Sequence, residues 1–244
     1  MRGKVERVMK YQYAALTNIG RRDVNEDALN VRTGCYGICA VLADGLGGQG
    51  AGDWASGLAV EQAVQALSGV WPVTDKRLEA SFQAVNADIR RQQLASNNRM
   101  MTTLACLRTT GAGVHFAHVG DTRIYWFRDG RILYQSEDHS MSQCMVASGE
   151  ITPEQVRGHS SRNLLTRAMG YRDDLQVTTF HGRAQRGDRF LLCTDGFWEW
   201  VLEGEMASLG GQQPQIWLDA MEKLLRSRYD QEADNYSAIA VIAE

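Results

Sequence analysis

Acidic residues stand beside several apolar runs of this sequence, and strand ends are where a rigid scaffold tends to gather functional side chains. Asp44 directly follows one such run, and Asp121 and Asp195 follow two others after a closing glycine or threonine. Glu26-Asp27 and Asp234 stand just before two further runs. Acidic residues at five strand ends are more than chance placement suggests, so the set is a candidate for chemistry.

The chemistry that such a cluster favours is the binding of a hard divalent cation. Carboxylates held close together repel one another and raise each other's pKa, whereas Mg²⁺ and Mn²⁺ prefer carboxylate, carbonyl and water oxygens. Glycines beside Asp44 and Asp195 permit close backbone approach, so the carbonyl of Gly45 is a candidate ligand. A single Asp-Gly pair is more often a turn, as Asp129-Gly130 illustrates, so the metal interpretation rests on the whole set.

The elements that must position these residues are short strands and three longer helices. Apolar runs predict strands at 13–16, 28–31, 38–43, 103–107, 114–119, 190–193 and 237–242, and a hairpin at 124–134 that turns at Asp129-Gly130. Apolar residues at helical spacing predict helices at 51–67, 76–94 and 215–228. Because strands and helices come in separate groups, the pattern favours an α+β fold with antiparallel sheets.

Composition narrows the class of protein. The chain has 244 residues, 44% of them apolar, and only three prolines, which predicts one domain over residues 1–244. A net charge of −3 gives no support for nucleic-acid binding. The five cysteines are odd in number and include no CxxC pair, so we interpret them as small buried hydrophobes in a reducing compartment. Residues 1–10 have no apolar signal-peptide core and no run is long enough to span a membrane, which predicts a cytoplasmic location.

A series of motifs follows the acidic residues along the chain: Gly20-Arg21-Arg22-Asp23-Val24-Asn25-Glu26-Asp27, Asp44-Gly45-Leu46-Gly47-Gly48, Thr102-Thr103-Leu104, Gly120-Asp121-Thr122-Arg123, Gly187-Asp188 through Asp195-Gly196, and Asp234-Asn235-Tyr236-Ser237. In this order they resemble the bacterial metal-dependent Ser/Thr protein phosphatases, the PPM or type 2C family. The resemblance extends from about Tyr13 to Val241.

The resemblance implies a four-layer αββα sandwich, in which two antiparallel sheets are flanked by helices. It implies that Asp44 bridges two Mn²⁺ or Mg²⁺ ions, with the Gly45 carbonyl on one of them and Asp195 and Asp234 on the other. Glu26 and Asp27 would hold the cluster directly or through its waters. The remaining implied roles are a third, weaker metal on Asp121 with Asp195, and a substrate-phosphate clamp at Arg22.

The resemblance also implies a flap at about 141–162, followed by a strand within 162–170. Two positions depart from the family pattern. Leu46 stands where animal members carry a histidine, proposed as the general acid, so no acid is assigned here. Met101 stands where the family usually has glycine before Thr102.

The expected activity is hydrolysis of phosphoserine and phosphothreonine in proteins by a water shared between two metals, with Asp44 and Arg22 as catalytic residues. The expected partners are phosphorylated proteins, which are the products of a cognate Ser/Thr kinase. The chain is expected to act as a monomer and to bind neither nucleic acid nor a membrane. Two alternatives are a catalytically silent module that docks phosphoproteins and a metal nuclease or phosphodiesterase. The complete set of acidic positions opposes the first, and the ordered motifs oppose the second.

Overall fold

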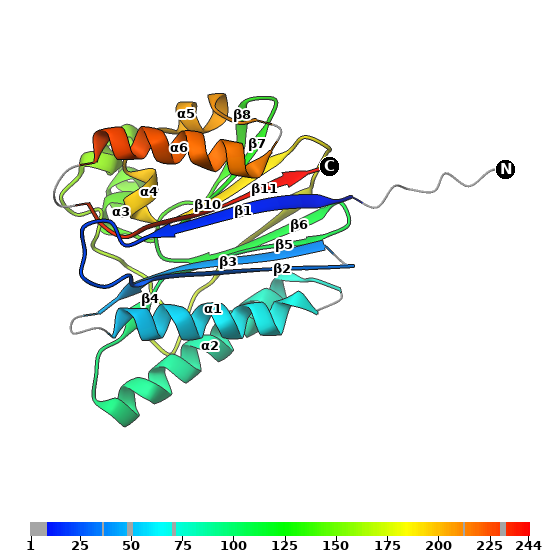
Figure 1. Ribbon diagram of the computed structural model, residues 1–244. Helices are drawn as coiled ribbons and strands as arrows, with labels where there is room; N and C mark the ends of the chain where they lie inside the picture. The colour runs from blue at the N-terminus through cyan, green and yellow to red at the C-terminus, as the bar shows by residue number, and fades with distance from the viewer. Residues whose placement is uncertain (1–8, 36, 48–50, 70–71, 212, 230–232) are drawn as a thin grey trace.

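Two antiparallel β-sheets stack face to face at the centre of the computed structural model, which describes residues 9–35, 37–47, 51–69, 72–211, 213–229 and 233–244 (Figure 1). Sheet A has the spatial order β1 (Tyr11–Asn18), β11 (Tyr236–Ala243), β10 (Arg189–Cys193), β7 (Arg123–Arg128) and β8 (Arg131–Gln135). Sheet B has the order β2 (Asp27–Gly34), β3 (Gly37–Leu46), β5 (Leu104–Thr110), β6 (Gly113–Val119) and β9 (Thr178–Arg183), with β4 (Met101–Thr102) paired to β3.

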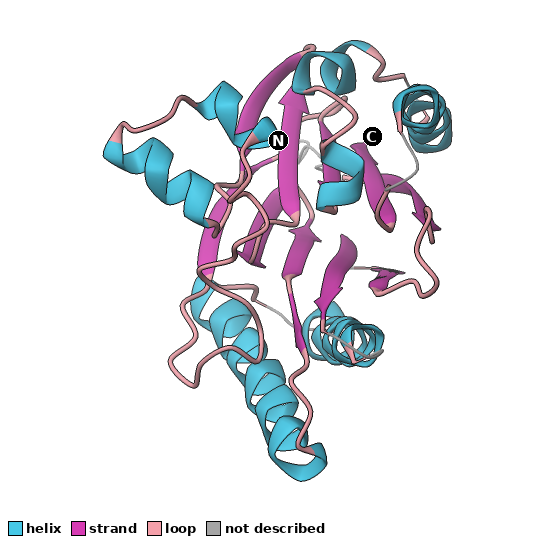
Figure 2. Cartoon of the chain, turned by 90° about the vertical axis from the view of Figure 1, so that its left-hand side faces the viewer, coloured by secondary structure: helices cyan, strands magenta, loops and turns pink. Residues whose placement is uncertain are grey.

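Helices cover the outer face of each sheet, which gives the four layers that the resemblance implied (Figures 1 and 2). The long helices α1 (Gly52–Ser68) and α2 (Asp75–Ser96) lie on sheet B. Sheet A is covered by α4 (Asp195–Trp198), α5 (Glu203–Ser208) and α6 (Pro214–Arg228). The predicted α+β class and the αββα sandwich are therefore confirmed.

The middle strands are apolar along their whole length because both of their faces are buried. In β3, Ile38, Ala40 and Leu42 point into the core between the sheets, whereas Cys39 and Val41 pack against α1 and α2. Strand β11 behaves in the same way, with alternate residues in the inter-sheet core and under α6. A strand buried on both faces reads as a continuous apolar run instead of an alternating one.

Two strands were missed by the sequence analysis, and one predicted strand is wrong. Strands β4 and β9 were not predicted. Strand β9 is an edge strand with exposed residues and a glycine, and β4 has only two residues, so neither carries a strong apolar signal. The strand expected within 162–170 is wrong: that segment makes only isolated bridges, Ser140 with Leu165 and Thr102 with Met169.

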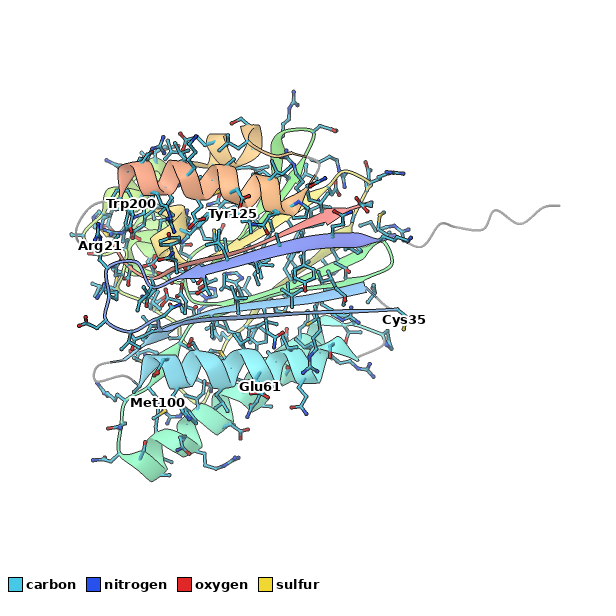
Figure 3. All side chains as sticks on the ribbon, in the orientation of Figure 1. Arg21, Cys35, Glu61, Met100, Tyr125 and Trp200 are labelled. Atoms are coloured by element: carbon cyan, nitrogen blue, oxygen red, sulfur yellow. The ribbon has the colours of Figure 1, made fainter. Side chains whose placement is uncertain are left out.

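The cysteine interpretation holds in part. Cys39, Cys106 and Cys193 are buried, as expected of small apolar side chains, but Cys35 and Cys144 are exposed. Cys35 lies in the connection between β2 and β3, at one end of the sandwich (Figure 3), and Cys144 lies on α3 (Met141–Ser148). All five are free thiols.

The segment expected to be a flap contains α3 and the short 3₁₀-helix η1 (Pro153–Gly158). Helix α3 begins at Ser140, whose hydroxyl accepts a hydrogen bond from the backbone N–H of Gln143, and ends at Gly149 with a φ of +78°. Helix η1 begins with a capping box between Thr152 and Gln155. Among the helices that the structure describes, none is long and apolar enough to cross a membrane.

His139 lies two residues before α3 and is hydrogen-bonded to Gly120, just after β6 of sheet B. Its burial makes the stability of the fold depend on pH. Its Nδ1 accepts the backbone N–H of Gly120 at 3.1 Å, which requires a neutral ring, and the ring stacks on His118 at 4.6 Å between centroids. Burial, and then the neighbouring charges of His118 and Arg167, lower the pKa of His139 to about 3. The folded state therefore takes up a proton on this ring only far below the pKa of about 6.5 that applies in the unfolded chain.

We expect the free energy of unfolding to fall as the pH drops below 6.5, because only the unfolded state then protonates His139. This residue alone should account for a loss of about 2 kcal/mol between pH 7.5 and pH 5. Urea unfolding of His139→Gln at the two pH values should show a pH dependence weaker by that amount. His181→Gln, at an exposed histidine, is the matched control and should keep the wild-type slope. Equal slopes in wild type and His139→Gln would contradict the prediction.

Candidate metal centre

Asp44 lies near the end of β3, where its backbone is fixed on both sides by threonines. The hydroxyl of Thr103 accepts the Asp44 N–H at 2.8 Å, and the Asp44 carbonyl accepts the Thr103 N–H at 2.8 Å and the Thr102 hydroxyl at 2.8 Å. The Thr103 hydroxyl also contacts that of Thr122 at 2.6 Å. The central Thr-Thr pair of the sequence therefore holds Asp44, a role that the sequence alone did not assign.

Antiparallel pairing places Asp27 directly opposite Asp44, because β2 and β3 are in register at these two residues. The Oδ2 of Asp27 accepts a hydrogen bond from the hydroxyl of Thr194 at 3.0 Å, which reaches across from sheet A. The Oδ1 of Asp27 is buried and has no hydrogen-bond partner. An unsatisfied carboxylate oxygen inside a protein is costly unless something pairs with it.

Sheet A supplies Asp195 and Asp234, and sheet B supplies Asp121. Asp195 is the first residue of α4, just after β10, and Asp121 follows β6, where its carbonyl accepts the indole N–H of Trp198 at 3.1 Å. Asp234 stands two residues before β11. The site thus lies at the seam between the sheets, at the end of the sandwich that Figure 2 views face on.

The electrostatics show that these carboxyls share one small volume. Burial raises the pKa of Asp44 well above its usual range, and repulsion from Asp195, Asp27, Asp121 and Asp234 raises it further. Burial followed by Glu199 and Asp234 raises the pKa of Asp195 to about 7. The pKa of Asp27 is also raised to about 7 and that of Asp121 is raised strongly, each first by burial and then by Asp195.

The donor chemistry suits a divalent cation, although among the described residues no group of three or more His, Cys, Asp or Glu side chains, as they lie, could hold one. The carboxyls instead bind one another and Arg22: Asp195 is hydrogen-bonded to Asp44, and Asp234 pairs with the guanidinium. The donor set consists of hard oxygens, and both the mutual repulsion and the orphaned Oδ1 of Asp27 would be relieved by a bound cation.

Gly45 and Glu26 lie where α1 meets the site. The N–H of Gly45 donates to the Glu26 carbonyl at 3.0 Å, and a Cβ on Gly45 would lie 2.3 Å from the carbonyl oxygen of Gly52. Gly45 is therefore required by close approach and not by a positive φ. The Glu26 carboxylate accepts the N–H of Gly52, the first residue of α1, whose N-cap Ala51 offers no side-chain cap.

Arg22 lies at the rim of the site. Its Nη2 is 2.8 Å from Oδ2 of Asp234, and more than half of its side chain is exposed. A cavity of about 470 Å³ opens here, lined by Arg22, Arg157, Arg162, Asn163, Asp195, Glu199, Trp200, Ala233 and Asp234. Figure 3 shows Arg21 and Trp200 at this end of the molecule, opposite Cys35.

Two arginines within residues 141–162 that the sequence did not single out line this cavity. Arg157 donates to both carboxylate oxygens of Glu203 at 2.8 Å, and Arg162 Nε donates to Glu199 at 2.5 Å. Glu203 also accepts from Arg123, which stacks 3.5 Å from the ring of Trp198. These charge pairs tie residues 141–162 to the end of α4 and to α5, and no local sequence pattern predicts them because the partners are 37 or more residues apart.

Asp129 and the two departures from the family pattern can also be placed. Asp129 and Gly130 both have positive φ, +49° and +73°, and join β7 to β8, which confirms the hairpin turn. Leu46 and Met101 are directly opposite each other in the β3–β4 pairing. The histidine and the glycine of the family pattern are therefore replaced here by two apolar side chains at one cross-strand position.

Comparison with known proteins shows which proteins this chain is similar to. The model of the family described as protein phosphatase 2C matches residues 17–235. A serine/threonine phosphatase stp from Listeria innocua is 35% identical over 180 residues, which cover 69% of this chain and 70% of that protein. The serine/threonine protein phosphatase PstP of Mycobacterium tuberculosis is 36% identical over 191 residues, or 76% of this chain and 36% of that longer protein.

Solved structures agree with the sequence relatives. The M. tuberculosis phosphatase PstP/Ppp superposes with a TM-score of 0.84 at 31% identity, over 95% of this chain and 98% of that one. The catalytic domain of PstP in complex with two manganese ions gives a TM-score of 0.81 at 30% identity, over 96% and 99%. The carboxylate seam between two sheets thus occurs in a chain that belongs to the protein phosphatase 2C family.

Proposed function

We propose that this chain hydrolyses phosphoserine and phosphothreonine monoesters in proteins, with two Mn²⁺ or Mg²⁺ ions held by Asp44, Asp195 and Asp234. The Gly45 carbonyl is a further ligand to one of these two ions. Glu26 and Asp27 hold the metal cluster directly or through water. Asp121 with Asp195 holds a third ion. Family membership and the manganese-bound relative support this proposal.

One observation carries the metal assignment: the buried Oδ1 of Asp27 has no partner, inside a group of carboxyls whose pKa values are raised by one another. A structural ion-pair cluster would contain basic side chains of its own. Among the described residues, the arginine that forms an ion pair with one of these carboxyls is Arg22, at the exposed rim, and the charge of Arg123 lowers the pKa of Asp121. Bound cations would supply the remaining neutralising charge.

A pair of divalent cations lowers the pKa of a water and neutralises phosphoryl oxygens in such sites. The chain's own residues orient the substrate. Arg22 presents a planar guanidinium to the cavity, and its exposed donors suit two oxygens of a phosphate. Leu46 offers no ionisable group at the position of the animal histidine, so no side chain there protonates the leaving oxygen.

We infer that the substrates are products of a cytoplasmic Ser/Thr kinase, and that the chain acts as a monomer with a single catalytic domain whose flap spans 141–162. The cavity of about 470 Å³ beside Arg22 supports a protein substrate, because it has room for a phosphorylated side chain. The free cysteines support a reducing compartment.

Removal of one site carboxylate should nearly abolish turnover. Asp44→Asn or Asp195→Asn should lower kcat for a phosphothreonine peptide with Mn²⁺ by more than about 100-fold, since even residues that merely support metal ligands change activity by about 10- to 100-fold. Asp129→Asn is the matched control, because asparagine tolerates the positive φ of that turn. Wild-type rates in either site variant would refute the assignment.

Mn²⁺ should stabilise the protein independently of turnover. At about 100 times its dissociation constant, it should add about 2.7 kcal/mol, which raises the Tm by roughly 5–10 °C for a domain of this size. Asp44→Asn should lose most of this rise and should melt higher than wild type in EDTA, because one repelling charge is gone. A rise of equal size in Asp44→Asn would count against the site.

Arg22→Ala should raise KM for a phosphopeptide by about 10- to 100-fold, as expected for losing hydrogen bonds from a charged donor, with a smaller effect on kcat. Arg21→Ala removes the same charge from the neighbouring residue, whose guanidinium lies over Tyr229, and serves as the control. An unchanged KM in Arg22→Ala would remove the phosphate clamp from the proposal.

A further inference from the structure

The segment that carries Arg22 has little structure of its own. Residues 19–26 connect β1 to β2 and form neither helix nor strand. Within the segment, the Arg22 N–H donates to the Ile19 carbonyl at 3.2 Å. The position of the Arg22 backbone therefore depends on contacts from outside the segment.

Asn235 supplies three of these contacts, at both ends of the segment, and the Ala233 carbonyl supplies another by accepting the Arg21 N–H at 3.0 Å. Its Nδ2 donates to the Ile19 carbonyl at 2.8 Å and to the Val24 carbonyl at 3.0 Å. Its Oδ1 accepts the Glu26 N–H at 2.8 Å. The amide uses both of its donor hydrogens and its oxygen on three backbone groups, and a flipped amide would satisfy none of them, so the orientation is unambiguous.

Asn235 is itself firmly held. It is 6% exposed and directly precedes β11, which lies between β1 and β10 in sheet A. A Cβ on Gly196 would lie 2.1 Å from the Asn235 carbonyl oxygen, so α4 packs closely against this residue. Gly20, with a φ of +62°, similarly packs against the Asp234 carbonyl. The segment 19–26 thus packs against the start of β11, which is held by its neighbours in sheet A and by α4.

We propose that Asn235 is the positioning residue of the phosphate clamp: its side-chain amide holds the segment 19–26 so that Arg22 stands beside Asp234 over the cavity. The inference rests on the clamp role proposed above for Arg22. Holding the guanidinium in place before substrate arrives removes the entropy loss that a free loop would suffer on binding. Asn235 touches no substrate, so its effect must pass through Arg22.

Chemistry singles out asparagine at this position. Aspartate has the same shape but would place an oxygen against the two carbonyls that now receive hydrogen bonds. Alanine removes all three contacts without adding a repulsive atom. The two substitutions therefore disturb the segment to different degrees, and Asn235→Asp should have the larger effect.

The test is a double-mutant cycle with Arg22→Ala, measured as kcat and KM on a phosphothreonine peptide with Mn²⁺. Asn235→Ala should raise KM by about 10-fold, the scale of losing a buried hydrogen-bond network, and Asn235→Asp should raise it further, with kcat within about 3-fold in both variants. In the Arg22→Ala background the same changes should leave KM within about 2-fold. The rise in Tm on adding Mn²⁺ should persist in both variants, which separates the effect from loss of metal at Asp234.

Asn86 provides a matched control. It is 2% exposed, its Oδ1 accepts the Gly170 N–H at 2.6 Å, and its Nδ2 donates to the Arg172 carbonyl at 2.7 Å. Asn86→Asp should lower the Tm to a similar degree without changing KM. A KM rise in Asn86→Asp equal to that of Asn235→Asp would assign the effect to general destabilisation and overturn the inference.

The outcomes separate the two proposals. If Arg22→Ala leaves KM unchanged, the clamp itself fails and the inference fails with it. If Arg22→Ala raises KM but the Asn235 variants do not, or if their effects add fully to that of Arg22→Ala, only the role of Asn235 is overturned. Hydrogen exchange of the wild-type Glu26 amide, which Asn235 accepts, needs no variant: protection is expected, and exchange at the rate of an exposed amide would refute the inference.

Discussion

Electrostatic repulsion among buried carboxyls is the constraint on which the rest of the structure depends. Asp27, Asp44, Asp121 and Asp195 come from different strand ends, and the pKa of buried Asp44 is raised by all three of the others. Such a group opposes folding unless other interactions compensate for it. The two sheets therefore hold the carboxyls in place through their strand pairing, and the apolar core between the sheets outweighs the repulsion.

Uncharged hydrogen-bonding side chains hold several of the site residues. Thr102 and Thr103 hold Asp44, Thr194 binds Asp27 from the opposite sheet, and Asn235 binds the segment around Arg22. Hydroxyl and amide groups serve this purpose well, because they satisfy buried backbone groups without adding charge to a site that already has an excess. The flap is held differently, through arginine–carboxylate pairs at the cavity wall.

Much of the fold and of the acidic set could be predicted from the sequence, because their signals are local. The apolar run in β3 and the Asp129-Gly130 turn can each be recognised from a few neighbouring residues of the sequence. The contacts of Asn235 could not be predicted, since they join residues more than 200 positions apart. The same holds for Arg157 and Arg162, whose flap positions carry no periodic pattern, and for β9, an edge strand with a weak apolar signal.

The pairing of β1 with β11 has a consequence for when this domain can fold during synthesis. Tyr11 lies opposite Ala243 and Asn18 opposite Tyr236, so β1 cannot pair within sheet A until β11 is present. Contacts between such distant residues form late and slow folding. Asp195 and Asp234 also follow most of the domain in the sequence. The full set of carboxyls therefore comes together only after β11 has been made and has paired with β1.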